Sequence, residues 1–547
     1  MKTKSGAKKL NKLFGNTAYA AATMRNYEGA PAYVRTDEEQ LLRVLMTGSF
    51  EQTFYATDTE LSAEAIGLFR IFASRDPHFL AQAIVYARTE GLMRVAPITA
   101  LVVLSVEPRD DAKELFRRAF PKVIQTPGDL QDCLTLCRNS ALRGMGKAIT
   151  RAAGRWLAGM SQYHAIKYGS ESQEMSLRDM FRMVRPKLTG EANALARYLV
   201  KGEAAPELTQ VCGYEAFKRA AQAFQQSKAT LTDEERSTAE ARLLALIEEH
   251  RLPWEVITAQ VEGSRAVWEA MVRQMPYMAL IRNLNNAVKY GVTDSAAMLD
   301  YITGTLADRQ RVQTSRQLPF RFYSALRALK AEGDADVLLR AALESALEQS
   351  FVNMPELGRR VLVANDISGS MASRPSAKSD MTMSEIAGIF AAAAFKKAEE
   401  GAIISFDTQA HPRDVSKSDS LASIAKAISG IGGGTSLSAP LEYAFGGKDT
   451  ARVYDVAVFL TDSESWYDHL TRNRGVLDLI REYRQRVNPA LTCFFVQFVP
   501  YKHAVVPQDE PGCYYIYGWS ASILSYIASV VNGGMEQMEA VRQVSVL

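Results

Sequence analysis

The chain has few of the residues on which disulfide frameworks and zinc sites depend. Its 547 residues include only five cysteines and six histidines. Cys133 and Cys137 are four apart in a predicted helix, and no second pair follows at the spacing of a zinc site. The remaining cysteines, Cys212, Cys493 and Cys513, are isolated. We therefore interpret all five as buried free thiols, which are usual in a reducing compartment.

Long apolar runs and a strong excess of one charge are also missing. No run reaches the ~18 apolar residues of a membrane-spanning helix, and the opening MKTKSGAKK lacks the apolar core of a signal peptide. The net charge of +3 is too small to indicate a partner by itself. Because single cores stop growing near ~250–300 residues, we expect a globular protein of two or more domains. Since no membrane span or signal peptide is predicted, we expect it in the cytoplasm.

Oxygen-bearing side chains follow two apolar segments and one glycine-rich turn. The segment RVLVANDISGS predicts a buried strand that ends at Asp366, with Ser368 and Ser370 in the loop beyond it. Thr435 follows three glycines, and Asp462 ends a second apolar segment, VAVFLT. Ligands of parallel sheets bind at the carboxyl ends of strands. We therefore expect these five side chains to meet at one edge of a sheet.

Such a set of oxygen ligands suits Mg²⁺ or another divalent cation. Because hydroxyls outnumber carboxylates, a bound ion would remain electrophilic and could accept an acidic group from a partner protein. The residues and their order resemble the metal-ion-dependent adhesion site of von Willebrand factor A domains. The alternative, in which Asp366 caps a helix and the glycines form an ordinary loop, explains each part alone but not all three.

The chain is expected to contain three regions. Residues 1–30 are basic and poorly periodic, and indicate a flexible arm. Residues 31–357 show apolar residues at three-to-four spacing almost throughout, which predicts paired helices in an α-solenoid of the HEAT type. Residues 358–547 alternate strands with helices, which predicts a doubly wound, mainly parallel sheet. The expected strands and helices of this last region are strands 361–366, 402–407, 455–461 and 491–499, and helices 383–399, 420–429, 436–445 and 475–485.

Basic side chains recur along one predicted helix of the solenoid. Arg143, Lys147, Arg151 and Arg155 are four apart, so they form one stripe, and no acidic residue interrupts it. A second basic face comprises Arg178, Arg182 and Arg185, with Lys187 just beyond it. Two such ridges would suit the phosphates of a nucleic acid. A solvated helix face remains the alternative for either one.

Short motifs in both halves resemble the Ro autoantigen family, whose helical part is called the TROVE domain. The motifs are LLRVLMTG near the start, GMGK, the pair Lys167-Tyr168 and LRDMFRM in the middle, and PWE, VW, MALIRNL and LPF before the A-type domain. The resemblance implies helical repeats closed into a ring whose two ends are held by the A-type domain. It also implies a non-catalytic scaffold that binds small noncoding Y RNA on the outer surface. Single-stranded 3′ ends of misfolded RNA would bind through the ring. In bacteria such a scaffold can work with polynucleotide phosphorylase.

The same resemblance assigns residues on the RNA surface. Lys167 and Tyr168 match a family pair beside that surface, and Arg182 matches a basic position of the following helix. Relatives often carry histidine where this chain has Arg185, which keeps the charge but loses the ring. Candidates for the lining of the ring hole are the arginines that flank the LPF motif, Arg309, Arg311, Arg316 and Arg321, for which a solvated loop is the alternative.

Two other functions are alternatives to an RNA-binding scaffold. A chelatase-type adapter would use the metal site for protein–protein contacts and the solenoid only as a platform. A metal-dependent nuclease would use Asp366 and Asp462, but two-metal nucleases need more carboxylates. Asp407 and His411 resemble an acid/base pair, although a structural role is the better interpretation.

Overall fold

The chain folds into two compact units in the computed structural model. The structure describes residues 24–25, 31–32, 36–47, 58–138, 145–169, 175–227, 231–317, 319–351, 356–357, 359–374, 381–445, 453–462, 475–498, 504–507, 510–518, 522–531 and 537–546. The helical unit comprises residues 98–317, 325–349 and 546–547, and the A-domain unit comprises residues 1–97, 318–324 and 350–545. Residues 1–97 thus belong to the same compact unit as the A-type domain. The sequence predicted that residues 31–97 would be part of the solenoid. Most of the arm predicted over residues 1–30 lies outside the described residues.

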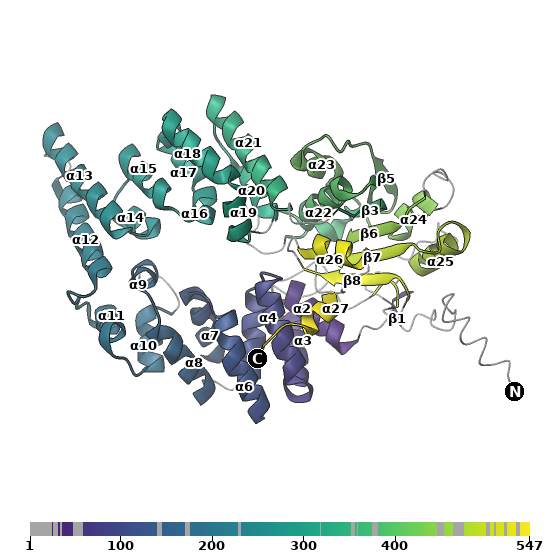
Figure 1. Cartoon of the computed structure of the whole chain (residues 1–547), viewed down its shortest axis with the longest axis horizontal. Coiled ribbons are helices and arrows are strands. Elements are labelled where there is room, and N and C mark those ends of the chain that lie inside the picture. The colour runs from purple at the N-terminus through teal and green to yellow at the C-terminus, as the bar shows by residue number, and fades with distance from the viewer. Residues whose placement is uncertain are drawn as a thin grey trace. The chain divides into compact units, whose positions relative to one another are not determined.

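The described part of the helical unit consists of helices and their connections (Figure 1). Its helices are α6 Asp110–Val123, α7 Pro127–Arg138, α8 Lys147–Ala158, α9 Gln162–Tyr168, α10 Leu177–Val184, α11 Gly190–Lys201, α12 Thr209–Ser227, α13 Asp233–His250, α14 Trp254–Gln260, α15 Arg265–Gln274, α16 Tyr277–Arg282, α17 Leu284–Lys289, η3 Val292–Asp294, α18 Ala296–Ala307, α19 Arg309–Ser315 and α21 Gly333–Gln349. Helices α5 Val95–Ser105 and α20 Pro319–Ala328 contribute residues to both units.

Amphipathic spacing and local caps explain why these segments are helical. In α6 the buried residues recur at three-to-four spacing, so one stripe faces the neighbouring helices. Ser176 and Asp179 form a reciprocal capping box at the start of α10, and Thr232 and Glu235 form another at α13. Neighbours such as α12 and α13, or α10 and α11, pack on one another. The predicted succession of packed helices is confirmed.

The A-type domain is built on a six-stranded sheet in the order β5-β4-β3-β6-β7-β8. Its strands are β3 Arg360–Asp366, β4 Glu400–Phe406, β5 Ala410–Arg413, β6 Val456–Thr461, β7 Thr492–Gln497 and β8 Cys513–Tyr517. All neighbours are parallel except the edge pair β4–β5. The four predicted strands are confirmed, whereas β5 and β8 were not predicted.

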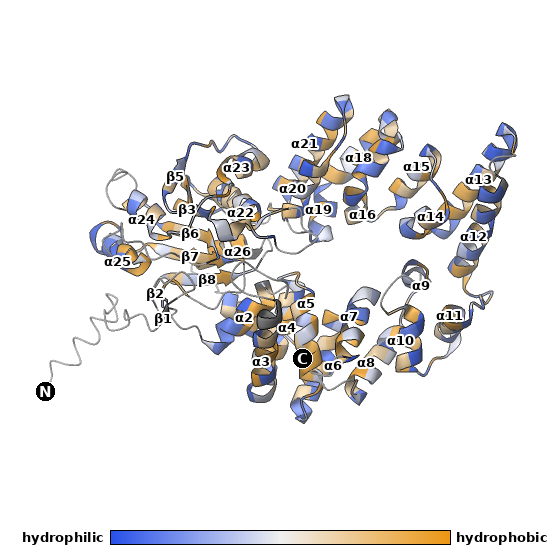
Figure 2. Cartoon of the chain, turned by 180° about the vertical axis from the view of Figure 1, so that it is seen from behind, coloured by the Kyte–Doolittle hydropathy of each residue, from blue (hydrophilic) through white to orange (hydrophobic). Residues whose placement is uncertain are grey.

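Helices follow the strands and cover the sheet, as a doubly wound fold requires. They are η4 Gly369–Ala372, α22 Met383–Lys397, α23 Leu421–Ile428, α24 Ser438–Phe445, α25 Val476–Arg486, α26 Ser522–Val531 and α27 Gln537–Arg542. Leu362 and Ala364 of β3 share a buried core with α24 and α25, and α22 packs on β3 as well. The inner strands β6 and β7 are coloured largely as hydrophobic in Figure 2, because both faces of the sheet are covered.

Helices from the first hundred residues pack against the last elements of the A-type domain. They are α2 Asp37–Thr47, α3 Asp58–Arg75 and α4 Pro77–Thr89, and a short antiparallel pair, β1 Met24–Arg25 and β2 Pro31–Ala32, precedes them. Gln82 donates to the backbone oxygens of Arg542 and Val544, and the rings of Tyr86 and Tyr526 lie 6.2 Å apart. These contacts join the two ends of the described sequence within one unit. No helix in the described ranges is long and apolar enough to cross a membrane.

Candidate functional sites

The first site lies where strand β3 ends. Asp366 and Ser368 are fully buried, and Ser370 is nearly so. The backbone N–H of Ser368 donates to Oδ1 of Asp366 over 2.8 Å, and the hydroxyls of Ser368 and Ser370 lie 3.2 Å apart. The turn after β3 therefore holds one carboxylate and two hydroxyls in a compact group.

Backbone hydrogen bonds tie the glycine-rich turn to this loop. The N–H of Gly432 donates to the oxygen of Ile367 over 2.6 Å, and the N–H of Gly369 donates to the oxygen of Gly433 over 2.8 Å. A Cβ at position 432 would lie 2.4 Å from Oδ2 of Asp407, so only glycine fits there. The turn carries the buried Thr435, whose hydroxyl makes no hydrogen bond with another described residue. The second part of the predicted site is thus next to the first.

Strand β6 supplies the third part. It runs parallel to β3 in direct pairing, and Thr461 at its end donates its hydroxyl to Oδ2 of Asp366 over 2.6 Å. The next residue, Asp462, is buried, and its backbone oxygen accepts from Nε2 of Gln497 over 3.2 Å. All five predicted oxygen ligands therefore come from three segments that meet at the carboxyl edge of the sheet.

The chemistry of this group fits a hard cation. Burial raises the pKa of Asp366 to about 6, although the hydrogen bonds from Ser368 and Thr461 oppose that rise. Within the described part of the chain no Lys, Arg or His pairs with this buried carboxyl group. A divalent cation would supply the missing positive charge, and carboxylate and hydroxyl oxygens are ligands that Mg²⁺ accepts.

Asp407 has a structural position beside the site. It accepts hydrogen bonds from the backbone of Gln409 and Gly433, and its Oδ1 lies 2.9 Å from Nε2 of His411. These bonds hold the glycine-rich turn, which agrees with the structural interpretation. In the described ranges no three His, Cys, Asp or Glu side chains cluster as metal ligands. Those ranges therefore contain no carboxylate cluster of the kind that a two-metal nuclease needs.

The predicted basic stripe lies on the exposed face of α8. Ile149, Ala152, Ala153 and Leu157 form the buried face of this helix. Lys147, Arg151 and Arg155 are exposed, and none of them pairs with an acidic side chain among the described residues. The fourth member, Arg143, lies outside the described residues.

The second basic face is less uniform than the sequence indicated. Arg182 and Lys187 are exposed. Arg185 is exposed too, and ends α10 in the left-handed conformation, with φ of 48°. Arg178 is partly buried, and its Nε donates to the backbone oxygen of Leu199 over 3.2 Å. Arg178 therefore also holds the end of α11, a role that its spacing alone could not reveal.

Lys167 is paired within the protein. Its Nζ lies 2.8 Å from Oε1 of Glu255 and within 6 Å of the ring centres of Tyr163 and Tyr168. Burial lowers the pKa of Lys167, but the hydrogen bond and charge of Glu255 outweigh this effect and raise the pKa above its ordinary value. Burial and the charge of Lys167 lower the pKa of the neighbouring His164. Lys167 is thus a charged group that organises an aromatic cluster. Its pairing with Glu255 was not predicted, although Glu255 belongs to the PWE motif.

The candidates for the ring hole lie at two places in the sequence. Arg309 and Arg311 are exposed on α19, and Arg316 follows the helix in the left-handed conformation, with φ of 49°. Arg321 on α20 belongs to the A-domain unit, and its guanidinium lies 5.1 Å from the ring centre of Phe320. Their role as a lining stays a prediction.

Comparisons with known proteins agree with this pairing of domains. Residues 360–531 match the family model of the Ro60 vWA domain, and residues 249–335 match that of the TROVE domain. The predicted resemblance to the Ro family is confirmed. A relative named RNA-binding protein RO60, from Caenorhabditis elegans, is 22% identical over 93% of this chain and 90% of its own length. One of the same name from Deinococcus radiodurans is 27% identical over 81% of this chain and 83% of its own length.

A solved structure supports the fold over most of the chain. The crystal structure of the Deinococcus radiodurans Ro (RSR) protein matches with a TM-score of 0.63 and 21% identity, over 91% of this chain and 100% of that chain. The predicted fold class, a mainly helical region followed by a von Willebrand factor A-like domain, is confirmed.

Proposed function

We propose that this protein is a non-catalytic RNA-binding scaffold. The observation that carries the proposal is the exposed stripe of Lys147, Arg151 and Arg155 on α8, none of which pairs with an acidic side chain among the described residues. Like charges at this spacing weaken a helix, so a row of them without acidic partners among the described residues favours a polyanionic ligand. The naming of two relatives as RNA-binding proteins makes RNA the favoured polyanion.

The finer proposal follows the Ro family. Small noncoding Y RNA would bind on the outer surface of a ring of helical repeats, and single-stranded 3′ ends of misfolded RNA would enter the ring, in RNA quality control or processing. Polynucleotide phosphorylase is a candidate partner in the cytoplasm. Direct binding of a labelled structured RNA to the purified intact chain tests the general proposal, because a protein without an RNA site would show no saturable binding at physiological salt.

We further propose that Asp366, Ser368, Ser370, Thr435 and Asp462 bind Mg²⁺ or another divalent cation. The buried carboxyl group of Asp366, which has no basic partner among the described residues, supports this assignment. The bound ion would accept an acidic side chain from a protein partner, so an adapter function can coexist with RNA binding. Titration of the intact protein with Mg²⁺ and Mn²⁺ in a calorimeter tests metal binding directly.

A further inference from the structure

A pocket opens in the helical unit beside the cluster around Lys167. It has a volume of about 480 Å³, and its lining comes from α9, α12, the turn between α13 and α14, and the end of α15. The polar and aromatic side chains in the lining are Tyr163, Gln210, Arg251, Trp254, Arg273 and Gln274. None of the described lining residues is acidic. The pocket is therefore large enough for a nucleotide and suited in charge to an anion.

The ion pair between Lys167 and Glu255 fixes two walls of the pocket. Tyr163 precedes Lys167 on α9, and Trp254 precedes Glu255 on α14, so the pair joins the two helices that carry the aromatic rings. Both rings are half-buried. Aromatic surfaces held in this way can stack on an unpaired base.

Arg251 stands at a backbone position where glycine would be less strained. It ends α13 with φ of 47° and ψ of 52°, in the left-handed region that favours glycine. Arg251 and Arg273 are exposed, and neither makes an ion pair with a described residue. The guanidinium of Arg273 lies 5.4 Å from the ring centre of Tyr301. A strained, unpaired arginine at the mouth of a pocket is consistent with a ligand contact.

We propose that this pocket takes one unstacked nucleotide of single-stranded RNA, with the base against Tyr163 and Trp254 and a phosphate at Arg251 and Arg273. The inference rests on the proposed RNA binding and adds a site away from the stripe on α8. An acidic peptide could satisfy the two arginines, but it would leave the aromatic walls without a planar partner, so RNA is favoured.

Arg251→Gly separates a functional role from a structural one. Glycine relieves the left-handed backbone, so the melting temperature should stay the same or rise, while removal of the guanidinium should weaken RNA binding. Fluorescence anisotropy with a labelled single-stranded RNA of about ten nucleotides should show a loss of about fivefold or more. Arg236→Gln is the matched control, because it removes one arginine charge from the first turn of the same helix, and its affinity should remain that of the wild type.

Trp254→Phe supplies a second measurement. If a base stacks on this ring, the oligomer should quench part of the tryptophan fluorescence of the wild type, and the variant should lose that part. Wild-type affinity in Arg251→Gly together with unchanged quenching in Trp254→Phe would overturn the pocket and leave the proposed function intact. A wild-type protein that does not bind the oligomer would overturn RNA binding itself.

Two competitors identify the ligand. Adenosine monophosphate should compete far more weakly than the oligomer; equal competition would make the pocket a site for free nucleotides and overturn the RNA assignment. A peptide of about ten glutamates should not displace the oligomer from the pocket, and displacement as strong as that by RNA would overturn the preference for a base.

Discussion

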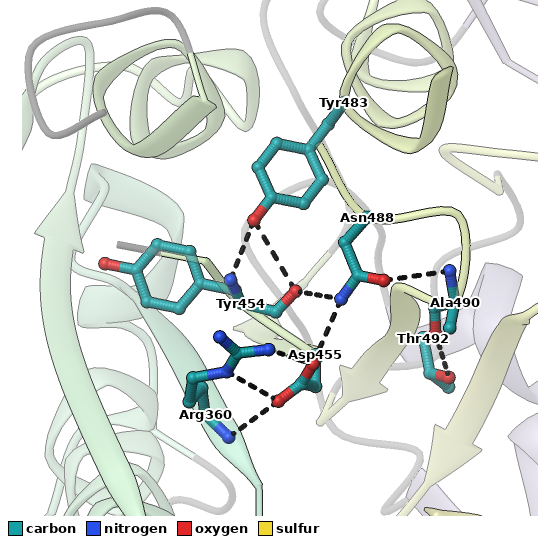
Figure 3. Close-up of polar contacts among 7 residues, drawn as sticks. All are labelled: Arg360, Tyr454, Asp455, Tyr483, Asn488, Ala490 and Thr492. Atoms are coloured by element: carbon teal, nitrogen blue, oxygen red, sulfur yellow. Dashed lines mark hydrogen bonds and ion pairs between the residues drawn. The ribbon is translucent and has the colours of Figure 1, made fainter. Parts of the chain in front are cut away.

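Arg360 and Asp455 join the amino ends of the two strands that lead to Asp366 and Asp462, the carboxylates of the proposed metal site. Nε and Nη2 of Arg360 donate to Oδ2 and Oδ1 of Asp455 over 2.9 and 2.8 Å (Figure 3). Asn488 also donates to Oδ1 of Asp455, over 3.0 Å. Since β3 and β6 pair in parallel from this point, the ion pair helps to fix the register that places Asp366 beside Thr461.

Asp455→Asn should destabilise the protein and change its response to acid. The hydrogen bond from Arg360, opposed in part by burial, holds the pKa of Asp455 below its ordinary value. The unfolded chain therefore binds the proton more readily, so this stabilisation is present above about pH 4 and is lost as the pH falls. At pH 7 the variant should melt about 2–4 °C lower than the wild type. This difference in melting temperature should become smaller toward pH 3. Thermal unfolding followed by circular dichroism measures both, with the exposed Asp414→Asn as the control; a gap that does not change with pH would contradict the prediction.

Asp366→Ala should abolish divalent-metal binding and leave RNA affinity largely intact. The proposed metal ligands belong to the A-type domain, whereas the basic stripe belongs to the helical unit. Calorimetric titration with Mn²⁺ and filter binding with a structured RNA provide the two measurements. Asp414→Ala is the control for loss of one carboxylate, and circular dichroism must show that Asp366→Ala is folded. Metal affinity equal to that of the wild type would remove Asp366 from the site.

Charge reversal of the stripe should weaken the binding of structured RNA. Lys147→Glu with Arg151→Glu replaces phosphate attraction with repulsion, and we expect a loss of about tenfold or more. The affinity of the wild type should fall by about one order of magnitude between about 50 and 200 mM salt. The control is Arg117→Glu with Arg118→Glu, an equal charge change at two exposed residues of α6. Salt-independent binding, or an equal loss in both double variants, would reject the stripe.

A free single-stranded 3′ tail should increase affinity for a structured RNA. If the helical repeats form a ring, an unpaired strand can thread and stack whereas an A-form duplex is too wide. Competition between a tailed RNA and its blunt version measures the preference, and Arg309→Gln with Arg311→Gln should reduce it. Equal affinity for the two RNAs would leave only binding on the outer surface.

The sequence predicted which oxygen-bearing side chains would meet at the sheet edge better than it predicted the surroundings of the basic side chains, for a physical reason. Strands β3 and β6 are continuous apolar runs buried on both faces, so both their existence and their polar ends are evident. Strand β5 is short, irregular and contains Pro412, which only an edge strand tolerates, and it was missed. The pairing of Lys167 with Glu255 depends on the packing of α9 on α14, a contact between distant segments that helical periodicity does not encode.

The packing of α2 and α4 on the last elements of the A-type domain has a consequence for folding. Gln82 is synthesised long before the backbone oxygens of Arg542 and Val544 that it contacts. The faces of these early helices that meet α27 must therefore remain without their final partners until residues 537–544 have been made. Contacts so distant in sequence slow folding and leave apolar surface exposed in the meantime. Completion of this unit is thus a late event in the assembly of the molecule, and the loss of α27 would remove the surface against which α4 packs.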